Sequence, residues 1–190
     1  MYKTSDDRRF RKNKKEIRRA FIDLVMEKGY EKITISDIAH RADINRMTFY
    51  AHYDAIEDIF TEFIDDMEAD IMEAISTEEE FSIDRLFNLL NGLMFEEIEF
   101  FRRVAKDPSL AAFRKGFKDT ISQIIRVDLK QGAEEPLEKR LITSDLVAVC
   151  IAYSYLDWLA GDYGDVPLTD VVEITKDMLK TQLTRIEYRK

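Results

Sequence analysis

The sequence predicts an all-α fold, in which three short N-terminal helices are joined by a long fourth helix to a helical C-terminal domain. Apolar residues recur at helical spacing along almost the whole chain. The 190 residues include only six glycines and three prolines, which is few for a turn-rich β fold. The hydrophobic content of 45% is enough for a core.

Helix signals place the first three helices within about the first 53 residues. The first is expected from about residue 10 to residue 28, where Gly29 provides a C-terminal stop. Thr34 and Asp37 have the spacing of a capping box, which predicts a short second helix ending near residue 42. Asn45 is expected to cap a third helix that runs over residues 46–53.

The rest of the chain is expected to form five longer helices. Asp54 is expected to cap the fourth helix, whose apolar stripe continues to residue 75, before a polar linker at residues 76–80. Four further helices are expected over residues 82–105, 110–130, 137–160 and 168–190. This organisation predicts two domains, residues 1–54 and residues 55–190.

Charge is distributed unevenly between these two domains. Residues 1–53 contain 13 lysines and arginines and eight acids, although the whole chain has a net charge of −9. A basic head would attract a polyanion such as DNA, and an acidic body would be repelled by it. A solvated N-terminal tail with a chance charge asymmetry would give the same pattern.

Residues 35–53 have the pattern of a helix-turn-helix. Phe49 and Tyr53, at i and i+4, are expected to point into the core, so that Arg46, Met47 and Tyr50 point outward. Arginine can pair with the O6 and N7 atoms of guanine, and methionine can contact a thymine methyl group. Tyr50 is expected to contact a phosphate, a sugar or a thymine methyl group. An ordinary helical hairpin with a polar surface would show a similar pattern.

Four polar residues flank this outward face and complete the expected DNA-binding set. Thr34, Thr48 and His52 are expected to donate hydrogen bonds to phosphate oxygens, and Asn45 lies at the N-terminus of the third helix. Asp43, in the turn, tolerates a left-handed backbone better than most residues.

The segments at residues 29–39 (GYEKITISDIA) and 48–53 (TFYAHY) resemble the N-terminal domain of TetR-family regulators. The resemblance covers about residues 14–65 and implies an all-helical dimer whose divergent C-terminal domain binds a small ligand or a partner. Three positions depart from the family pattern. Asp43 replaces the usual glycine of the turn, Asn45 replaces a serine, and Ile56 replaces a lysine that touches phosphate. Basic residues 8–19 could offset that loss by reaching the DNA backbone or minor groove, or could form a solvated helix start.

The last two helices are expected to form a homodimer interface. Their apolar stripes consist of Leu146, Val149, Tyr153, Leu156 and Ala160, and of Val171, Ile174, Met178, Leu179 and Leu183. Packed against a second copy, they would make a four-helix interface, although part of each stripe must face the protein's own core. A two-fold dimer would present two recognition helices ~34–36 Å apart and would predict an inverted-repeat operator.

The C-terminal domain is also rich in aromatic residues that could line a small-molecule pocket. The candidates are Phe95, Phe101, Phe117, Tyr155 and Trp158, although ordinary core packing accounts for the same residues. The acids Glu96, Glu97 and Glu99 would suit a cationic ligand if one faced inward, and would otherwise be solvated.

Other function classes find little support. His40 and His52 are the only histidines, and no metal-spaced cluster, phosphate loop or nucleophile elbow is present, so neither catalytic residues nor a metal or cofactor is expected. The single cysteine, Cys150, permits no intramolecular disulfide and is expected to be packed inertly. The first ten residues lack the apolar core of a signal peptide, and the longest apolar run, residues 146–153, is shorter than the ~20 residues of a membrane span. A cytoplasmic protein without a membrane partner is therefore expected.

Together these features predict a sequence-specific, DNA-binding regulator of transcription. The expected form is a ligand-responsive repressor that binds double-stranded operator DNA as a homodimer and is controlled by a small-molecule effector. The alternative is a module of the same fold with weak DNA binding of its own, which acts through a protein partner.

Overall fold

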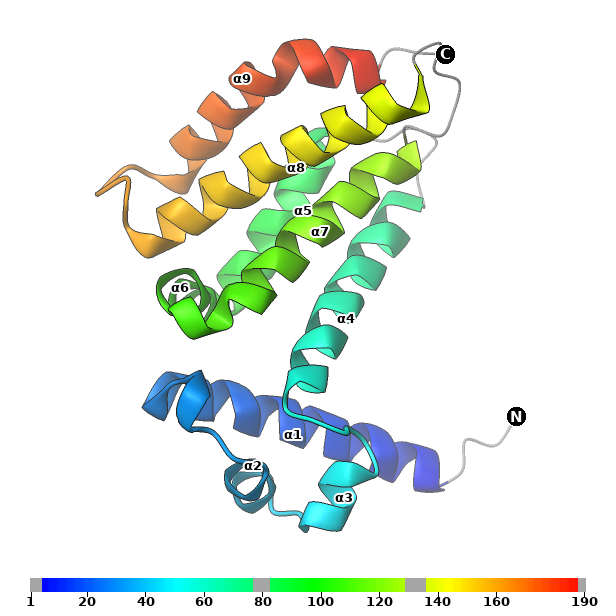
Figure 1. Ribbon diagram of the computed structural model, residues 1–190, viewed down its shortest axis with the longest axis vertical. Coiled ribbons are helices and arrows are strands. Elements are labelled where there is room, and N and C mark those ends of the chain that lie inside the picture. The colour runs from blue at the N-terminus through cyan, green and yellow to red at the C-terminus, as the bar shows by residue number, and fades with distance from the viewer. Residues whose placement is uncertain (1–4, 77–82, 129–135, 188–190) are drawn as a thin grey trace. The chain divides into compact units, whose positions relative to one another are not determined.

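The computed structural model describes residues 5–76, 83–128 and 136–187, and every regular element in these residues is a helix (Figure 1). The prediction of an all-α fold is confirmed. The chain forms two compact units, residues 1–63 and residues 64–190. The division falls inside α4 (Glu57–Ser76), whereas the sequence analysis placed it between residues 54 and 55. The assignment of a function to each domain stays a prediction.

The N-terminal unit contains α1 (Ser5–Lys28), a 3₁₀ turn η1 (Tyr30–Lys32), α2 (Ile35–Arg41), α3 (Arg46–Tyr50) and the first residues of α4. α2 packs against both α1 and α3. The core is built from the predicted apolar stripe of α1 together with residues of the following helices, namely Ile17, Ala20, Phe21, Leu24, Val25, Ile38, Ala39, Phe49, Tyr53, Ile59, Phe60 and Phe63. Such a core fixes the angle between the short helices, which could not be stable alone.

Polar contacts hold α2 against α1. Gly29 ends α1 with a φ of 81°, in the left-handed region that glycine adopts without strain. Beyond it, the Arg41 guanidinium pairs bidentately with the Glu27 carboxylate, at 2.8 and 2.6 Å. The Lys28 ammonium lies 2.7 Å from an Asp37 carboxylate oxygen. The two ends of α2 are therefore each tied to α1.

The start of α4 differs from the prediction. Asp54 was expected to cap this helix, but the helix begins three residues later, and the Asp58 carboxylate accepts hydrogen bonds from the backbone N–H groups of Asp54 and Ala55, both at 2.8 Å. The expectation for Asp54 was wrong because an acid inside the first turn can satisfy free N–H groups as well as an acid before it. α3 also ends at Tyr50, earlier than the predicted residue 53.

The C-terminal unit is a helical bundle centred on α8. It contains the end of α4, α5 (Ile83–Glu96), α6 (Ile98–Lys106), a 3₁₀ turn η2 (Pro108–Leu110), α7 (Ala111–Asp128), α8 (Leu137–Ala160) and α9 (Leu168–Glu187). α8 packs against α6, α7 and α9 (Figure 1). The predicted bounds of α8, and the start of α9, are confirmed.

One predicted helix of this unit is two helices. Residues 82–105 were expected to be continuous, but the backbone of Glu97 (φ −131°, ψ 41°) separates α5 from α6. Neither glycine nor proline marks the break. The predicted linker at residues 76–80 and the predicted end of α7 at residues 129–130 lie largely outside the described residues.

α8 has the composition of a buried helix. By length and composition alone it passes the test for a membrane span among the described residues. Its inner face, however, is covered by the bundle, since Val147, Ala148, Ile151 and Ala152 are buried. The buried Tyr155 hydroxyl donates to Asn91 Oδ1 at 2.6 Å, and burial raises the pKa of this tyrosine. α8 therefore serves as the central element of a globular bundle.

Candidate nucleic-acid interface

The N-terminus of α2 is closed by a capping box. Thr34 Oγ1 accepts a hydrogen bond from Asp37 N at 3.2 Å, and the Asp37 carboxylate accepts one from Thr34 N at 2.8 Å. The Thr34 hydroxyl also donates to this carboxylate at 2.6 Å. Hydrogen bonds from Lys28 and Thr34 lower the pKa of Asp37. The predicted capping box is confirmed, and the Thr34 hydroxyl proton, expected to reach a phosphate, is directed to Asp37 in the absence of DNA.

The turn between α2 and α3 is tight and left-handed. Asp43 has a φ of 52°, the only positive φ of a non-glycine residue in the described part of the chain. The Ile44 N–H then returns to the Ala39 carbonyl at 2.9 Å. The left-handed backbone expected for Asp43 is confirmed. This conformation reverses the chain direction within a few residues and brings α3 against the face of α2 that carries small side chains.

Asn45 caps α3. Its Oδ1 accepts hydrogen bonds from the Thr48 N–H at 2.7 Å and from the Thr48 hydroxyl at 3.1 Å. The predicted cap is confirmed. The Asn45 side-chain NH₂ group is not used in this cap and can donate to a phosphate, whereas the Thr48 hydroxyl proton is already engaged. As DNA contacts, both residues stay predictions.

α3 separates a scaffold face from an outward face. Phe49 is fully buried and Tyr53 is 5% exposed, whereas Met47 is 78% exposed and Tyr50 is 44% exposed. Arg46 is exposed as well. The Tyr50 ring packs edge-on against Phe49, with 5.8 Å between ring centroids, which limits the directions in which its hydroxyl can point. The predicted division between inward and outward residues is confirmed, and it leaves three chemically different side chains on one exposed face.

His52 is partly buried against α1, whereas it was expected to act only as a phosphate contact. Its ring lies 4.1 Å from that of Phe10 on α1, and its Nδ1 is buried without a hydrogen-bond partner in the described part of the chain. Burial and the nearby Lys14 ammonium lower the pKa of His52, and Glu62 opposes them. His52 is therefore held neutral more strongly than a free histidine, and only its other ring nitrogen can reach a phosphate.

Lys14 and Phe10 connect α1 to the end of the helix-turn-helix. The Lys14 ammonium pairs with Glu62 at 3.0 Å and lies over the rings of Phe10 and Tyr53, 5.8 and 5.9 Å from their centroids. This cluster had no signal in the apolar pattern, because Phe10 is 44% exposed. The i and i+4 spacing of Phe10 and Lys14 on α1 is the one feature of the sequence that could have suggested their contact.

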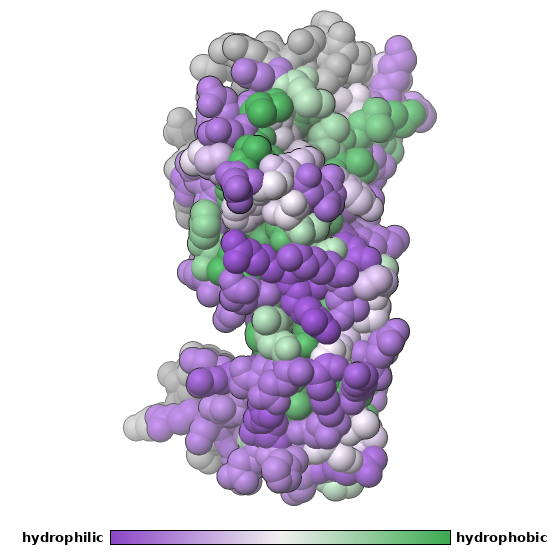
Figure 2. All heavy atoms as spheres, turned by 90° about the vertical axis from the view of Figure 1, so that its left-hand side faces the viewer, coloured by the Kyte–Doolittle hydropathy of each residue, from purple (hydrophilic) through white to green (hydrophobic). Residues whose placement is uncertain are grey.

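Basic side chains cover the N-terminal turns of α1. The helix begins at Ser5, so residues 8–19 are helical, and Arg8, Arg9, Arg11, Lys12, Lys15 and Arg19 are exposed. The face of the N-terminal unit that Figure 2 shows is mostly hydrophilic. An exposed basic helix fits both alternatives for this segment, so its contact with DNA stays a prediction.

The five aromatic residues predicted to line a pocket do not share one environment. Phe101, Phe117 and Tyr155 are buried in the core, Phe95 is exposed, and Trp158 is partly exposed, with its Nε1 donating to the Val166 carbonyl at 2.9 Å. Two cavities in the C-terminal unit are lined by other residues. One, of about 580 Å³, lies between α7 and α8, and one, of about 530 Å³, lies along α8 and α9.

The outer surfaces of α8 and α9 carry exposed apolar residues. These are Ile142, Leu146, Val149 and Tyr153 on α8, and Ile174 and Met178 on α9. Other members of the predicted interface stripes, Leu156, Val171 and Leu179, are buried in the bundle, and the side chain of Leu183 lies outside the described residues. Ile142 was missed, although it stands one turn before Leu146. Cys150, expected to be packed, is half-buried and lines the α8–α9 cavity.

No group of three or more histidine, cysteine or acidic side chains in the described part of the chain is placed to hold a metal ion.

Comparison with known proteins finds sequences similar to the helix-turn-helix. Residues 17–63 match the family model described as bacterial regulatory proteins, tetR family. The chain is 37% identical over 81 residues to the HTH-type transcriptional regulator YxbF of Bacillus subtilis (strain 168), a match that covers 40% of this chain and 21% of that relative. The chain thus aligns with about a fifth of the length of this curated relative.

Solved structures resemble the whole chain. The dihydroxyacetone kinase operon activator DhaS superposes with a TM-score of 0.65 at 18% identity, over 92% of this chain and 98% of that one. A TetR-family regulator from Syntrophomonas wolfei superposes with a TM-score of 0.66 at 20% identity, over 94% and 97%. At these identities the likeness establishes the fold of both units.

Proposed function

We propose that the chain is a TetR-family transcriptional regulator, and that it is a ligand-responsive repressor that binds an inverted-repeat operator as a homodimer. The protein acts in the cytoplasm, where its DNA lies, and performs no catalysis of its own. Its effector is a small molecule bound by the C-terminal unit.

The exposed face of α3 carries this proposal. Arg46, Met47 and Tyr50 combine a bidentate donor, an apolar contact and a hydroxyl group, and these are the groups that distinguish base pairs in the major groove. The buried Phe49 holds these side chains outward in a fixed register. The exposed basic turns of α1 add a sequence-independent attraction for phosphate.

The apolar outer surface of α8 and α9 supports the homodimer. A two-fold axis places the same patch of both copies face to face, so that Leu146 and Tyr153 of one copy meet the patch of the other. An exposed apolar patch of this kind is unusual on a monomer. Two copies then present two α3 helices, and half-sites about one helical turn apart, ~34–36 Å, follow from that symmetry.

The repressor acts by occupying its operator, and the effector releases it. A ligand that binds better to one arrangement of the dimer's two N-terminal units shifts the population toward that arrangement. If that arrangement does not match the half-site spacing, the free energy of operator binding becomes less favourable by the coupling free energy, typically about 1–3 kcal/mol.

Fluorescence anisotropy with labelled promoter DNA from beside the protein's own gene tests the proposal. We expect saturable binding that weakens steeply as salt rises and is competed poorly by unrelated DNA. Binding that ignores sequence, or no binding at low salt, would refute it.

A second candidate is a co-regulator that acts through a protein partner. It is favoured by Ile56, in the turn directly before α4, where the family pattern has a phosphate-contacting lysine. It is also favoured by the fold shared with DhaS, an operon activator by its name. Operator binding that requires a co-purifying protein would favour this candidate over the autonomous repressor.

A further inference from the structure

The cavity between α7 and α8 is polar, unlike the aromatic pocket expected from the sequence. It has a volume of about 580 Å³ and is lined by α7, α8 and one residue of α4, Glu68. Lys118, Arg126 and Arg140 contribute positive charge to its wall, and Leu137 and Leu141 contribute apolar surface at one end. A volume of this size accommodates a small metabolite.

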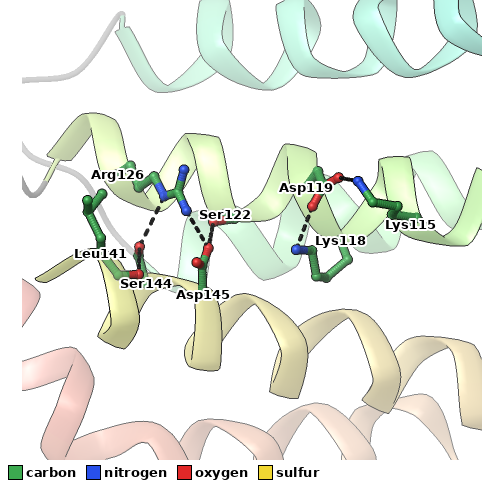
Figure 3. Close-up of polar contacts among 8 residues, drawn as sticks. All are labelled: Lys115, Lys118, Asp119, Ser122, Arg126, Leu141, Ser144 and Asp145. Carbon is green, nitrogen blue, oxygen red and sulfur yellow. Dashed lines mark hydrogen bonds and ion pairs between the residues drawn. The ribbon is translucent and has the colours of Figure 1, made fainter. Parts of the chain in front are cut away.

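The carboxylates at the α7 and α8 walls are already neutralised by the protein. Asp145 Oδ1 accepts hydrogen bonds from the Ser122 hydroxyl at 2.5 Å and from Arg126 Nη2 at 2.6 Å (Figure 3). Asp119 pairs through one oxygen with Lys118 and through the other with Lys115, both at 2.5 Å. Burial alone would raise the pKa of Asp119, but Lys115 and Lys118 outweigh it and lower that pKa. The hydrogen bonds from Ser122 and Arg126 lower the pKa of Asp145. Neither acid therefore needs a cation from outside.

The donors of the cavity, by contrast, exceed the acceptors that the protein offers them. Arg126 uses Nη2 on Asp145 and Nε on the Ser144 hydroxyl, at a long 3.4 Å, while its Nη1 has no partner in the described part of the chain. The Lys118 ammonium, with three N–H donors, has Asp119 as its ion-pair partner. Both cations are partly exposed, so a ligand can reach them.

We propose that this cavity binds a small organic anion, a carboxylate or a phosphate ester, through Arg126 and Lys118. The free Nη1 of the Arg126 guanidinium can donate a charge-assisted hydrogen bond to either oxyanion. Leu137 and Leu141 cover the carbon skeleton of the ligand, and Glu68, on α4, accepts a hydrogen bond from a hydroxyl or amine group that the ligand carries. That this ligand is the effector rests on the proposed function. Its contact with α4 supplies a link, because α4 begins in the N-terminal unit.

Isothermal titration calorimetry of the full chain, without DNA, tests the site. The probes are citrate for the carboxylate class and glycerol 3-phosphate for the phosphate class, with glycerol and choline as uncharged and cationic comparisons, all at constant ionic strength. We expect saturable binding of at least one anion, and binding of neither glycerol nor choline. Arg126→Gln and Lys118→Gln should each weaken anion binding roughly tenfold or more, since a hydrogen bond to a charged group is lost.

Matched controls separate this site from general charge effects and from misfolding. Arg102→Gln removes a surface cation that pairs with Glu99 on α6, at 2.9 Å, and should leave anion affinity unchanged. Arg126→Lys keeps the charge and should retain more affinity than Arg126→Gln. Failure of both anions to bind, tighter binding of choline, or unchanged affinity in both glutamine variants would overturn the proposal. Since no DNA is present, these results are independent of whether the protein binds an operator.

Discussion

The ring centroids of Phe10 and His52 lie 4.1 Å apart, so the basic start of α1 packs against the turn that follows α3. The contact joins α1, which carries most of the exposed positive charge of the N-terminal unit, to the turn directly after α3, the helix that presents Arg46, Met47 and Tyr50. This aromatic pair therefore adds to the buried core in fixing the surface proposed to attract phosphate relative to the surface proposed to read bases.

Removal of the Phe10 ring should weaken DNA binding more than it weakens folding. We expect Phe10→Ala to destabilise the protein by about 0.5–1.5 kcal/mol, the typical value of an aromatic pair, and to reduce the salt dependence of operator binding. Phe10→Tyr keeps the ring and serves as the control. Urea unfolding and anisotropy at two salt concentrations measure the two effects. An unchanged salt dependence in Phe10→Ala would mean that the start of α1 does not reach the DNA.

Acidification should destabilise the N-terminal unit through His52. Burial and Lys14 lower the pKa of this histidine in the folded state, so the unfolded state binds more protons between the folded value and the ordinary value of 6.5. The contribution of neutral His52 to the free energy of unfolding is therefore fully present above about pH 6.5, and it is lost as the pH falls through the folded-state pKa. Unfolding midpoints between pH 7.5 and pH 5 should fall less in His52→Phe, which keeps an aromatic ring but cannot titrate. Equal slopes would contradict this role of His52.

Specificity and folding should separate cleanly on α3. Arg46→Ala removes an exposed side chain and should relax the preference at one base pair by roughly 1–3 kcal/mol without changing stability. Phe49→Ala, three residues away, should instead cost about 3–5 kcal/mol of stability, because that ring is fully buried. Binding to a set of single-base operator variants distinguishes the two. A uniform loss over all variants would identify Arg46 as a phosphate contact.

A charge on the outer face of α8 should dissociate the proposed homodimer. Leu146 is 62% exposed, so Leu146→Glu should leave the fold intact and give a monomer in analytical ultracentrifugation. Phe95→Glu, a similarly exposed apolar position on α5, is the matched control and should stay dimeric. A Leu146→Glu protein that sediments like the wild type would exclude this surface as the interface.

Replacement of Asp43 by glycine should raise the free energy of unfolding. Asp43 holds a left-handed φ of 52°, which costs an L-residue roughly 1–2 kcal/mol, whereas glycine has no such cost but loses more entropy on folding. We expect Asp43→Gly to stabilise the protein by about 0.5–1 kcal/mol and Asp43→Ala to destabilise it. Thermal unfolding of the two variants checks the sign. Destabilisation by glycine would show that the aspartate side chain contributes to the turn.

Local signals in the sequence predicted the helix-turn-helix well. The capping box of Thr34, the cap of Asn45 and the left-handed turn at Asp43 each depend on residues within four positions, so the pattern specifies them. The bounds of α8 follow in the same way from Pro136 before it and Gly161, with a φ of 89°, after it. The burial of Phe49 follows from helical periodicity.

Features that depend on tertiary contacts were not predictable. The break at Glu97 carries no glycine or proline, and the Asp58 cap replaces an equally plausible Asp54. The apolar stripes of α8 and α9 could not be divided into buried and exposed members from periodicity alone. The polar cavity needs Arg126 of α7 and Asp145 of α8 to meet, 19 residues apart in the chain, and no local pattern encodes that pairing.

Four consecutive residues of α8 face three different environments. Ser144 and Val147 lie in the bundle core, Asp145 lines the α7–α8 cavity, and Leu146 is on the outer surface. Under the proposed function, adjacent residues of this helix serve separate purposes, namely folding, ligand binding and dimerisation. In a genetic selection for altered regulation, substitutions at neighbouring positions should fall into separate phenotypic groups: loss of protein, loss of response to the inducer, and loss of assembly.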